Sequence, residues 1–452
     1  MNIPLIVNTA RILLTAVAAA VVLAACNDSA QMAEQWPAAP RPTPTPGAVL
    51  ILPTPEASAL ADEAYAALNT LTMQYSPRES GTDQELDAAL YLQKNLDALG
   101  YDTSLQEFDT PHIIWADVHL TSDDGKPLMN TERSHLHPGA VTMSAGSATG
   151  LLTFVGEALN EDIPDEGLNG RIALMEHGAS AFDEQIRRVT KAGAAGAMVL
   201  TTEDHLFGAL SPYGPQTIPV ISAYSGGSHG SALLRLIQQE EVTAAVAVNE
   251  RKLFSQNVVA TMRGSEDIDR PQRRVILGAH YDTATNSQGA SDNGSGLAAL
   301  LTVARHVAER DYPFDIRIVL FGAEEFGLFG SERYVERMSH YQEIDSTIAM
   351  LNFDALGSGN SLTVSGDFDL TSEAIDIGRE LGASISLEGG GMSNSDHAPF
   401  QEAGIPTLFL SSSDISRINS PEDTIEHINP DLLGYAAEIG IAMLDSLADE
   451  MR

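Results

Sequence analysis

The sequence has little cysteine and few basic residues. It contains one cysteine in 452 residues, so no disulfide can form within the chain. Lysine and arginine together number 25, against 62 aspartates and glutamates, and the formal net charge is −37. A surface this negative repels phosphate groups, which argues against nucleic acids and anionic lipid headgroups as partners. The length suggests two or three domains, and a hydrophobic content of 43% is enough for a large core.

The first 25 residues have the composition of an export signal. The basic Arg11 is followed by an apolar run, a pattern typical of a secretory signal peptide. The run ends in Leu23-Ala24-Ala25-Cys26, which resembles the bacterial lipobox, whose cysteine is acylated and becomes the mature N-terminus. We therefore expect a lipoprotein signal peptide over residues 1–25 and lipidation at Cys26. The alternative is an uncleaved membrane helix with a buried thiol.

A lipid anchor at Cys26 implies an exported protein on the periplasmic or extracellular face of a bacterial membrane. Two or three acyl chains hold a protein stably at a membrane, and we expect no other membrane contact. Residues 26–56 are polar and proline-rich and include PAAPRPTPTPG. Because proline fixes φ and removes a hydrogen-bond donor, this segment is interpreted as an extended tether.

Helical periodicity begins after the tether. The stretch ASALADEAYAALNTLTM has apolar residues spaced three and four apart, which predicts a helix. A second helix is predicted over 83–99, because Gly100 supplies a C-terminal stop signal. The following YDTSLQEF is predicted to be a strand.

Strands and helices alternate after Asn257. The β-rich runs are VVATMRG, VILGAHYD, IRIVLFGAEE, TIAMLNFDALG and IPTLFLSS, and helical stretches over 296–310 and 328–338 lie between them. This alternation predicts an α/β domain whose mostly parallel central sheet is flanked by helices in three layers. Ligand sites in such sheets lie at the carboxyl ends of the strands.

Acidic and imidazole side chains recur at these strand ends. The eight residues are His280, Asp282, Asp292, Glu324, Glu325, Asp354, Asp396 and His397. Imidazole and carboxylate without thiolate suit zinc or a similar divalent ion, and a bridging carboxylate allows two ions in one site. One such residue alone is an ordinary loop residue, but eight at successive strand ends predict a metal centre.

Spacing suggests how some of these residues divide the work. His280 and Asp282 are two apart, so on a strand both side chains point to one face. Asp282 can then accept the second N–H of His280 and fix its tautomer. Of the adjacent Glu324 and Glu325, one can ligate a metal while the other faces a metal-bound water as a general base.

Five motifs together resemble the di-zinc aminopeptidase family (metallopeptidase family 28, aminopeptidase Y type). They are HYD, ASDNGSG, GAEEFGLFGS, NFDALG and SDHAPF, in the family's order and rough spacing, and the resemblance covers residues 57–444. It implies a zinc-dependent exopeptidase that acts on peptide substrates and releases N-terminal residues, with two zinc ions per chain.

The resemblance also implies a role for each matched residue. His280 and Asp354 would bind one zinc, Glu325 and His397 would bind the other, and Asp292 would bridge the two. The general base would be Glu324, and Asp282 would be the outer-shell partner of His280. The peptide bond Asp292–Asn293 is expected to be cis. The chain departs from the family at Asn419 in RINSPEDTIEHIN, where a histidine is common, and this puts substrate contacts in doubt.

A block in the middle of the chain resembles the protease-associated (PA) domain, a non-catalytic insert of several peptidase families. The match lies in GRIALMEHG, AGAAGAMVL and IPVISA. We therefore expect a β-rich α/β insert over residues 128–248, which divides the catalytic domain into residues 57–127 and 249–452.

Two other readings stay open. The same fold carries metallocarboxypeptidases, dipeptidases and glutaminyl cyclases, although Arg417 is the one arginine near a predicted site loop, and cyclases tend to lack the insert. The third reading is an inactive binding module, but every predicted ligand position holds a competent residue. Nothing in the sequence indicates an oligomeric state.

Overall fold

The computed structural model describes residues 55–110, 113–126, 128, 137–140, 146–177, 181–201, 217–224, 229–265, 273–284, 287–388 and 395–451. Cys26 and nearly all of the predicted tether lie outside these residues, so the lipid anchor stays a prediction. Within the described part, no helix is long and apolar enough to cross a membrane.

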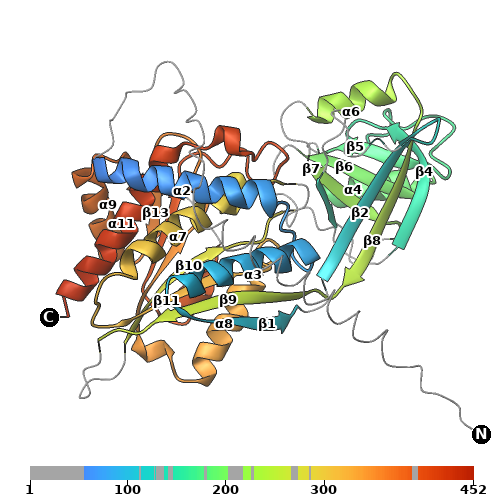
Figure 1. Ribbon diagram of the computed structural model, residues 1–452. Helices are drawn as coiled ribbons and strands as arrows, with labels where there is room; N and C mark the ends of the chain where they lie inside the picture. Colours follow the sequence, from blue (N-terminus) through green and yellow to red (C-terminus); the bar gives the residue numbers. More distant parts are fainter. Residues whose placement is uncertain are drawn as a thin grey trace, which may run out of the picture. The chain divides into compact units, whose positions relative to one another are not determined.

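An eight-stranded sheet forms the centre of the larger part of the chain (Figure 1). Its four middle strands are parallel and stand in the order β11-β10-β12-β15. Their bounds are β10 (Arg274–His280), β11 (Asp315–Phe321), β12 (Thr347–Phe353) and β15 (Thr407–Ser412). The prediction of a mostly parallel central sheet is confirmed.

Shorter or antiparallel strands extend the sheet on both sides. On one side β9 pairs antiparallel with β11, and β1 pairs antiparallel with β9. On the other side β13 pairs antiparallel with β15, and β14 forms the edge beside it. Their bounds are β1 (Asp102–Asp109), β9 (Phe254–Met262), β13 (Leu362–Gly366) and β14 (Ile385–Leu387).

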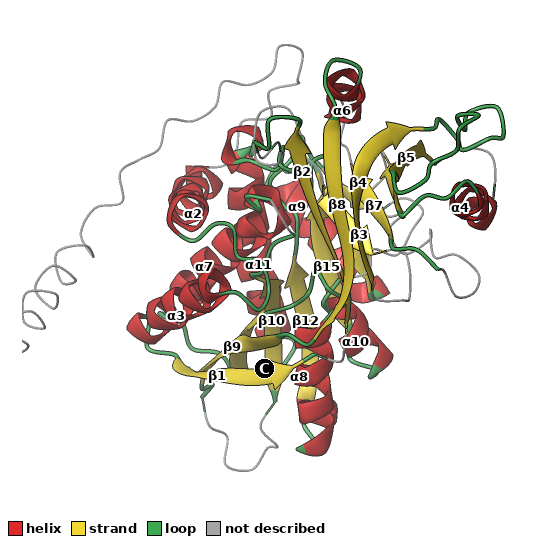
Figure 2. Ribbon diagram, turned by 90° about the vertical axis from the view of Figure 1, so that its right-hand side faces the viewer, coloured by secondary structure: helices red, strands yellow, loops and turns green. Residues whose placement is uncertain are grey.

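Helices cover both faces of this sheet, which gives the predicted three layers (Figure 2). One face carries a packed set of three helices, of which α7 also contacts β10. They are α2 (Pro55–Gln74), α7 (Gly296–Val307) and α11 (Pro430–Asp449), and α9 (Phe368–Glu380) packs against α11. The other face carries α8 (Phe329–His340) and α10 (His397–Glu402). The predicted second helix is α3 (Asp83–Ala98), which packs on β1 and β9.

Burial explains why the central strands read as continuous apolar runs. Every residue of β10 is buried, as expected for a parallel strand covered on both faces. Between the sheet and α8 and α10, the ring of Phe321 meets the rings of Tyr334 and Phe400 edge-on at 6.1 and 6.0 Å. Because Phe321 is the last residue of β11, these packed rings lie next to the carboxyl end of that strand.

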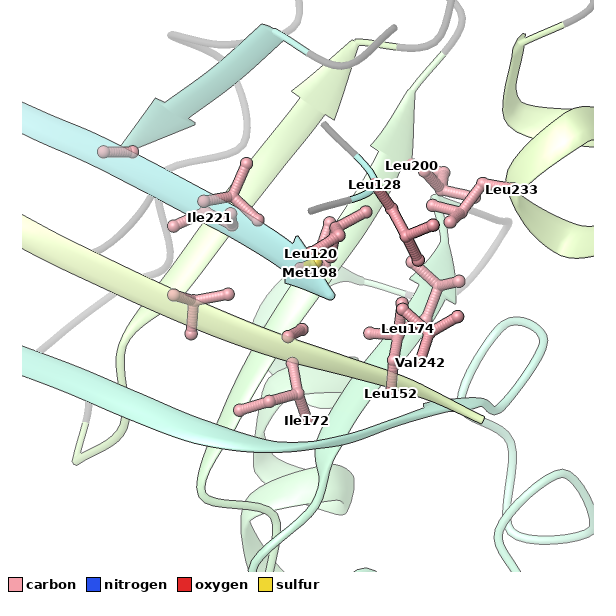
Figure 3. Close-up of a cluster of buried hydrophobic side chains, with 14 of the residues drawn as sticks. Leu120, Leu128, Leu152, Ile172, Leu174, Met198, Leu200, Ile221, Leu233 and Val242 are labelled. Atoms are coloured by element: carbon pink, nitrogen blue, oxygen red, sulfur yellow. The ribbon is translucent and has the colours of Figure 1, made fainter. Parts of the chain in front are cut away.

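A second, seven-stranded sheet has its own core. The strand order is β2-β8-β4-β5-β6-β7-β3, and it curls so that β2 and β3 approach each other. The bounds are β2 (Ile113–Ser122), β3 (His137–Ala140), β4 (Gly146–Phe154), β5 (Ile172–Glu176), β6 (Gly196–Thr201), β7 (Val220–Tyr224) and β8 (Val242–Arg251). Side chains including Leu120, Leu174, Met198, Ile221 and Leu233 fill the inside of the curl (Figure 3).

Two helices belong with this sheet, α4 (Phe182–Lys191) and α6 (His229–Ile237). Leu233 of α6 joins the core inside the curl, whereas Ile186 and Val189 of α4 pack in a separate buried cluster. The strands of the second sheet run from Ile113 to Arg251, a wider span than the 128–248 expected for the insert. The limits of a separate domain stay a prediction.

The start of α3 buries a carboxyl group beside the central sheet. Thr82 caps the helix by accepting the N–H of Glu85, and Glu85 accepts the N–H of Gly81 at 2.6 Å. The hydroxyl of Ser255 donates to the other carboxylate oxygen of Glu85. Burial raises the pKa of Glu85 from its usual 4.5 to about 8, even though these hydrogen bonds oppose the shift.

We expect Glu85→Gln to flatten the dependence of stability on pH. Because the folded pKa lies above the unfolded one, the contribution of Glu85 to stability is full below pH 4.5 and is lost as the pH rises through about 8. In the presence of EDTA, the thermal midpoint of the wild type should fall between about pH 6 and about pH 9, and that of the variant should fall less. The exposed Glu107→Gln is the matched control and should follow the wild type. Equal slopes for all three proteins would contradict the burial argument.

Candidate metal centre

Strand register brings the predicted site residues to one edge of the central sheet. Gly278 of β10 stands level with Asn352 of β12, so two residues further along each strand His280 comes beside Asp354. His280 is also level with Phe321, the last residue of β11. Glu324 and Glu325 lie in the turn that follows β11, and Asp292 lies between β10 and α7.

The imidazole of His280 stands at the centre of the carboxylates. Its Nε2 is 3.0 Å from Oδ1 of Asp292, 3.4 Å from Oδ1 of Asp354 and 3.9 Å from Oε2 of Glu324. Two sets of side chains each bring one potential ligand atom to within 4.8 Å of the others. The sets are His280, Glu324 and Asp354, and His280, Asp292 and Glu325. The structure therefore brings these five of the eight predicted residues together, and their roles as ligands stay a prediction.

Proton affinities in this cluster reflect burial and crowding of like charge. Burial, reinforced by neighbouring carboxylates, raises the pKa of Glu324 and of Glu325 well above 4.5. Burial also raises the pKa of Asp292, with the carboxylate of Asp354 adding to the effect. Burial by itself would lower the pKa of His280, but Glu324 and Asp354 outweigh it and hold that pKa well above 6.5. A divalent cation would offset this crowding of negative charge.

Several buried polar atoms at the site have no hydrogen-bond partner among the described residues. They are Nδ1 of His280, Oδ1 of Asp354 and Nδ1 of His397. Buried polar atoms in folded proteins are normally paired, and Oδ1 of Asp354, which is 3.4 Å from Nε2 of His280, lies where it could bind a cation. Imidazole and carboxylate are the donor types that zinc prefers when thiolate is absent.

His397 and Asp396 lie outside the two compact sets. The ring of His397 stacks on Phe409 with centroids 4.7 Å apart. Burial lowers the pKa of His397, while the carboxylate of Asp354 opposes the change, so the two groups interact electrostatically. Asp396 is fully buried beside it, and burial raises the pKa of Asp396 to about 7. The ligand role predicted for His397 therefore stays a prediction.

Asp282 holds the two glutamates more firmly than it holds His280. Its Oδ1 is 3.6 Å from Nδ1 of His280, longer than an N–H···O hydrogen bond. Its two oxygens instead accept the backbone N–H groups of Glu324 at 3.1 Å and of Glu325 at 3.2 Å. Asp282 also accepts the hydroxyl of Ser80 at 2.6 Å. One carboxylate thus fixes the turn that carries both glutamates.

The backbone around Asp292 is held from the other end of the chain. The peptide bond Asp292–Asn293 is cis, as the family resemblance implied. Asp423 accepts the N–H groups of Ser291 at 2.6 Å and of Asp292 at 3.0 Å. Sequence reasoning assigned no role to Asp423, although it lies in the SPEDT run, whose resemblance to a family motif was a usable signal.

A similar anchor orients Asp354. Its Oδ2 accepts the hydroxyl of Ser395 at 2.6 Å, and Ser395 in turn accepts an N–H of the Asn352 side chain at 2.9 Å. This leaves Oδ1 of Asp354 directed toward His280. Neither Ser395 nor Asn352 was predicted from the sequence as part of the site. Arg78 and Ser80, which lie in the connection between α2 and α3, were not predicted either.

The sequence is similar to those of known peptidases. The model for "Peptidase family M28" matches residues 257–444. The chain is 27% identical to the aminopeptidase YwaD of Bacillus subtilis over 402 residues, which is 84% of this chain and 83% of that protein. It is 30% identical to a probable leucine aminopeptidase 2 of Trichophyton verrucosum over 290 residues, covering 63% of this chain and 55% of the fungal protein.

Solved structures show the same fold. The zinc aminopeptidase BSAP from Bacillus subtilis superimposes with a TM-score of 0.66 and 25% identity, over 86% of this chain and 95% of that one. An M28 peptidase precursor from Shewanella amazonensis gives a TM-score of 0.59 at 20% identity.

We expect Asp292→Asn to weaken metal binding. An amide lacks the negative charge that Asp292 would supply to a cation in the set that it forms with His280 and Glu325. After zinc loading and desalting, the bound zinc per chain, measured by elemental analysis, should be clearly lower than in the wild type. The exposed Asp376→Asn is the control and should keep the wild-type zinc content. Full zinc content in Asp292→Asn would contradict a ligand role for this residue.

Proposed function

Because the chain belongs to peptidase family M28, we propose that it is a zinc-dependent aminopeptidase that releases N-terminal residues from peptides. The observation that carries the proposal is the convergence of His280 with four carboxylates inside the region matched by the family model. The similarity to a zinc aminopeptidase extends over 86% of the chain, which supports the same chemistry.

The proposed metal ligands divide between two zinc ions. His280 and Asp354 would hold one ion, Glu325 and His397 the other, and Asp292 would bridge them. The close approach of Asp292 and Asp354 to the same nitrogen of His280 supports the first part of this division. When bound, zinc polarises a carbonyl and lowers the pKa of water toward neutrality.

Glu324 is the proposed general base. Its side chain is 13% exposed, and burial raises its pKa well above 4.5, which suits a group that accepts a proton from the attacking water and returns it to the leaving amine. Its backbone N–H donates to Asp282, and this bond fixes the position of the backbone from which the side chain extends. The surplus of carboxylates around His280 also suits a positively charged amino group, and this favours substrates with a free N-terminus.

The remaining proposals concern location and organisation. We propose that the protein is exported and is anchored through a lipid on Cys26, and the evidence for this is the sequence of residues 1–26. The separate core of the curled second sheet supports a PA-like domain inserted into the catalytic domain.

We expect hydrolysis of aminoacyl-p-nitroanilides and none of the same compounds after N-acetylation. Acetylation removes the charge that the acidic site would bind, so only the free amines should be cleaved. Chelation should abolish the activity, and added zinc should restore it. Cleavage of the acetylated compounds would contradict an aminopeptidase. Absence of cleavage by protein with two zinc ions bound would favour carboxypeptidase or cyclase chemistry.

We expect Glu324→Gln to retain zinc and to lose turnover. General base catalysis is typically worth about 10²–10⁴-fold, so kcat should fall by a factor in this range. The exposed Glu336→Gln should keep the wild-type kcat and serves as the control. Activity close to wild type in Glu324→Gln would rule out the assigned role, whereas lost zinc would show that Glu324 is a ligand instead.

A further inference from the structure

A short segment between α2 and α3 reaches into the metal centre from about 200 positions away in the chain. Residues 76–81 read SPRESG and lie outside the region matched by the family model. Two of their side chains are buried at the site, those of Arg78 at 0% exposure and Ser80 at 4%. Neither was assigned a role by the sequence or by the proposed mechanism.

Arg78 joins the two ends of the loop that separates His280 from Asp292. Its Nε donates to the carbonyl of Tyr281 at 2.6 Å, and its Nη2 donates to the carbonyl of Gly289 at 3.0 Å. Tyr281 directly follows His280, and Gly289 precedes Asp292 by three residues. The guanidinium therefore bridges the two ends of this loop.

The backbone of the same residue adds to this contact. The N–H of Arg78 donates to the hydroxyl of Thr283 at 3.0 Å, and its carbonyl accepts the N–H of Thr283 at 3.2 Å. Gly289 has a φ of 61°, and a Cβ there would stand 2.2 Å from Cγ2 of Thr283 and 3.0 Å from Nη2 of Arg78. The loop passes so close to Arg78 that only glycine fits.

Arginine suits this position because of its shape. The planar guanidinium presents donors in a rigid fork, so it can serve two carbonyls at fixed separation, whereas lysine offers one flexible ammonium. Burying a charged group costs free energy. Around Arg78 this cost is offset by four carboxylates, those of Asp423, Asp282, Asp292 and Glu325.

Ser80 acts on the other half of the site. Its hydroxyl donates to Oδ2 of Asp282 at 2.6 Å, and Asp282 accepts the N–H groups of Glu324 and Glu325. Ser80 is therefore connected to Glu324 and Glu325 through the carboxylate of Asp282, by three hydrogen bonds in all.

We propose that residues 76–81 form a positioning clamp, in which Arg78 sets the separation of His280 and Asp292 and Ser80 sets the placement of Glu324 and Glu325. The Arg78 half depends only on metal binding. The Ser80 half rests on the proposed function, because its effect passes through the proposed general base.

The Arg78 half is tested by metal affinity. Removal of an outer-shell partner typically costs about 10–100-fold in metal affinity or activity, and we expect a loss in this range for both Arg78→Lys and Arg78→Met. Zinc affinity is measured by competition with a chromophoric chelator, and the visible spectrum of the cobalt(II) form reports the ligand geometry. The spectrum of both variants should differ from that of the wild type.

Controls separate the clamp from a general loss of stability. Arg274 is a buried arginine at the opposite end of β10, and Arg274→Lys should keep the wild-type zinc affinity and cobalt spectrum. Wild-type affinity in both Arg78 variants would overturn the proposal. Full recovery in Arg78→Lys with loss in Arg78→Met would also overturn it, since charge and not the fork would then be responsible.

The Ser80 half is tested by turnover at saturating zinc. We expect Ser80→Ala to bind zinc and to lower kcat about tenfold or more, with little change in KM, because the glutamates lose their support. The buried hydroxyl of Thr72 donates to carbonyls within its own helix α2, and Thr72→Val should keep the wild-type kcat. A lower melting temperature for Ser80→Ala with unchanged kcat would show a merely structural role and overturn this half.

The two halves also separate the clamp from the proposed function. If the zinc-loaded wild type cleaves no free-amine substrate, the aminopeptidase proposal fails. The zinc affinities and cobalt spectra of the Arg78 variants still decide whether the clamp exists.

Discussion

Crowding of negative charge around one buried imidazole is the constraint on which the rest of the structure depends. Asp292, Asp354 and Glu324 all approach Nε2 of His280 within 3.9 Å in a site with little access to water. Burial raises the pKa values of the two glutamates well above 4.5, and repulsion from the neighbouring carboxylates adds to this effect. Such an arrangement persists only if the surrounding structure holds each group in place.

The support comes largely from backbone amides and from the buried guanidinium of Arg78. Asp282 and Asp423 each accept two backbone N–H groups, and these four bonds fix the turns that carry Glu324, Glu325 and Asp292. Ser395 donates to one oxygen of Asp354, and the other oxygen faces Nε2 of His280. These groups position the site without entering it, as outer-shell partners of metal ligands commonly do.

The centre is assembled from three parts of the chain that are far apart in sequence. The strand ends after β10, β11 and β12 supply the cluster, the connection between α2 and α3 supplies Arg78 and Ser80, and the stretch before α11 supplies Asp423. The family model spans the first and last of these parts but not the second. The connection between α2 and α3 therefore contributes to the site, although it lies outside the region matched by the family model.

Much of this could be predicted from the sequence. Alternating apolar runs and helices determine a parallel sheet, and parallel strands end at one edge, so the convergence of His280, Glu324 and Asp354 follows from chain order alone. The distance between Asp282 and His280, and the contacts of Arg78 and Ser80, were decided only by the tertiary structure. A backbone carbonyl or amide can accept or donate a hydrogen bond whatever its side chain is, so such contacts leave no pattern in the sequence. The order of residues also does not give the distance between two residues that are about 200 positions apart.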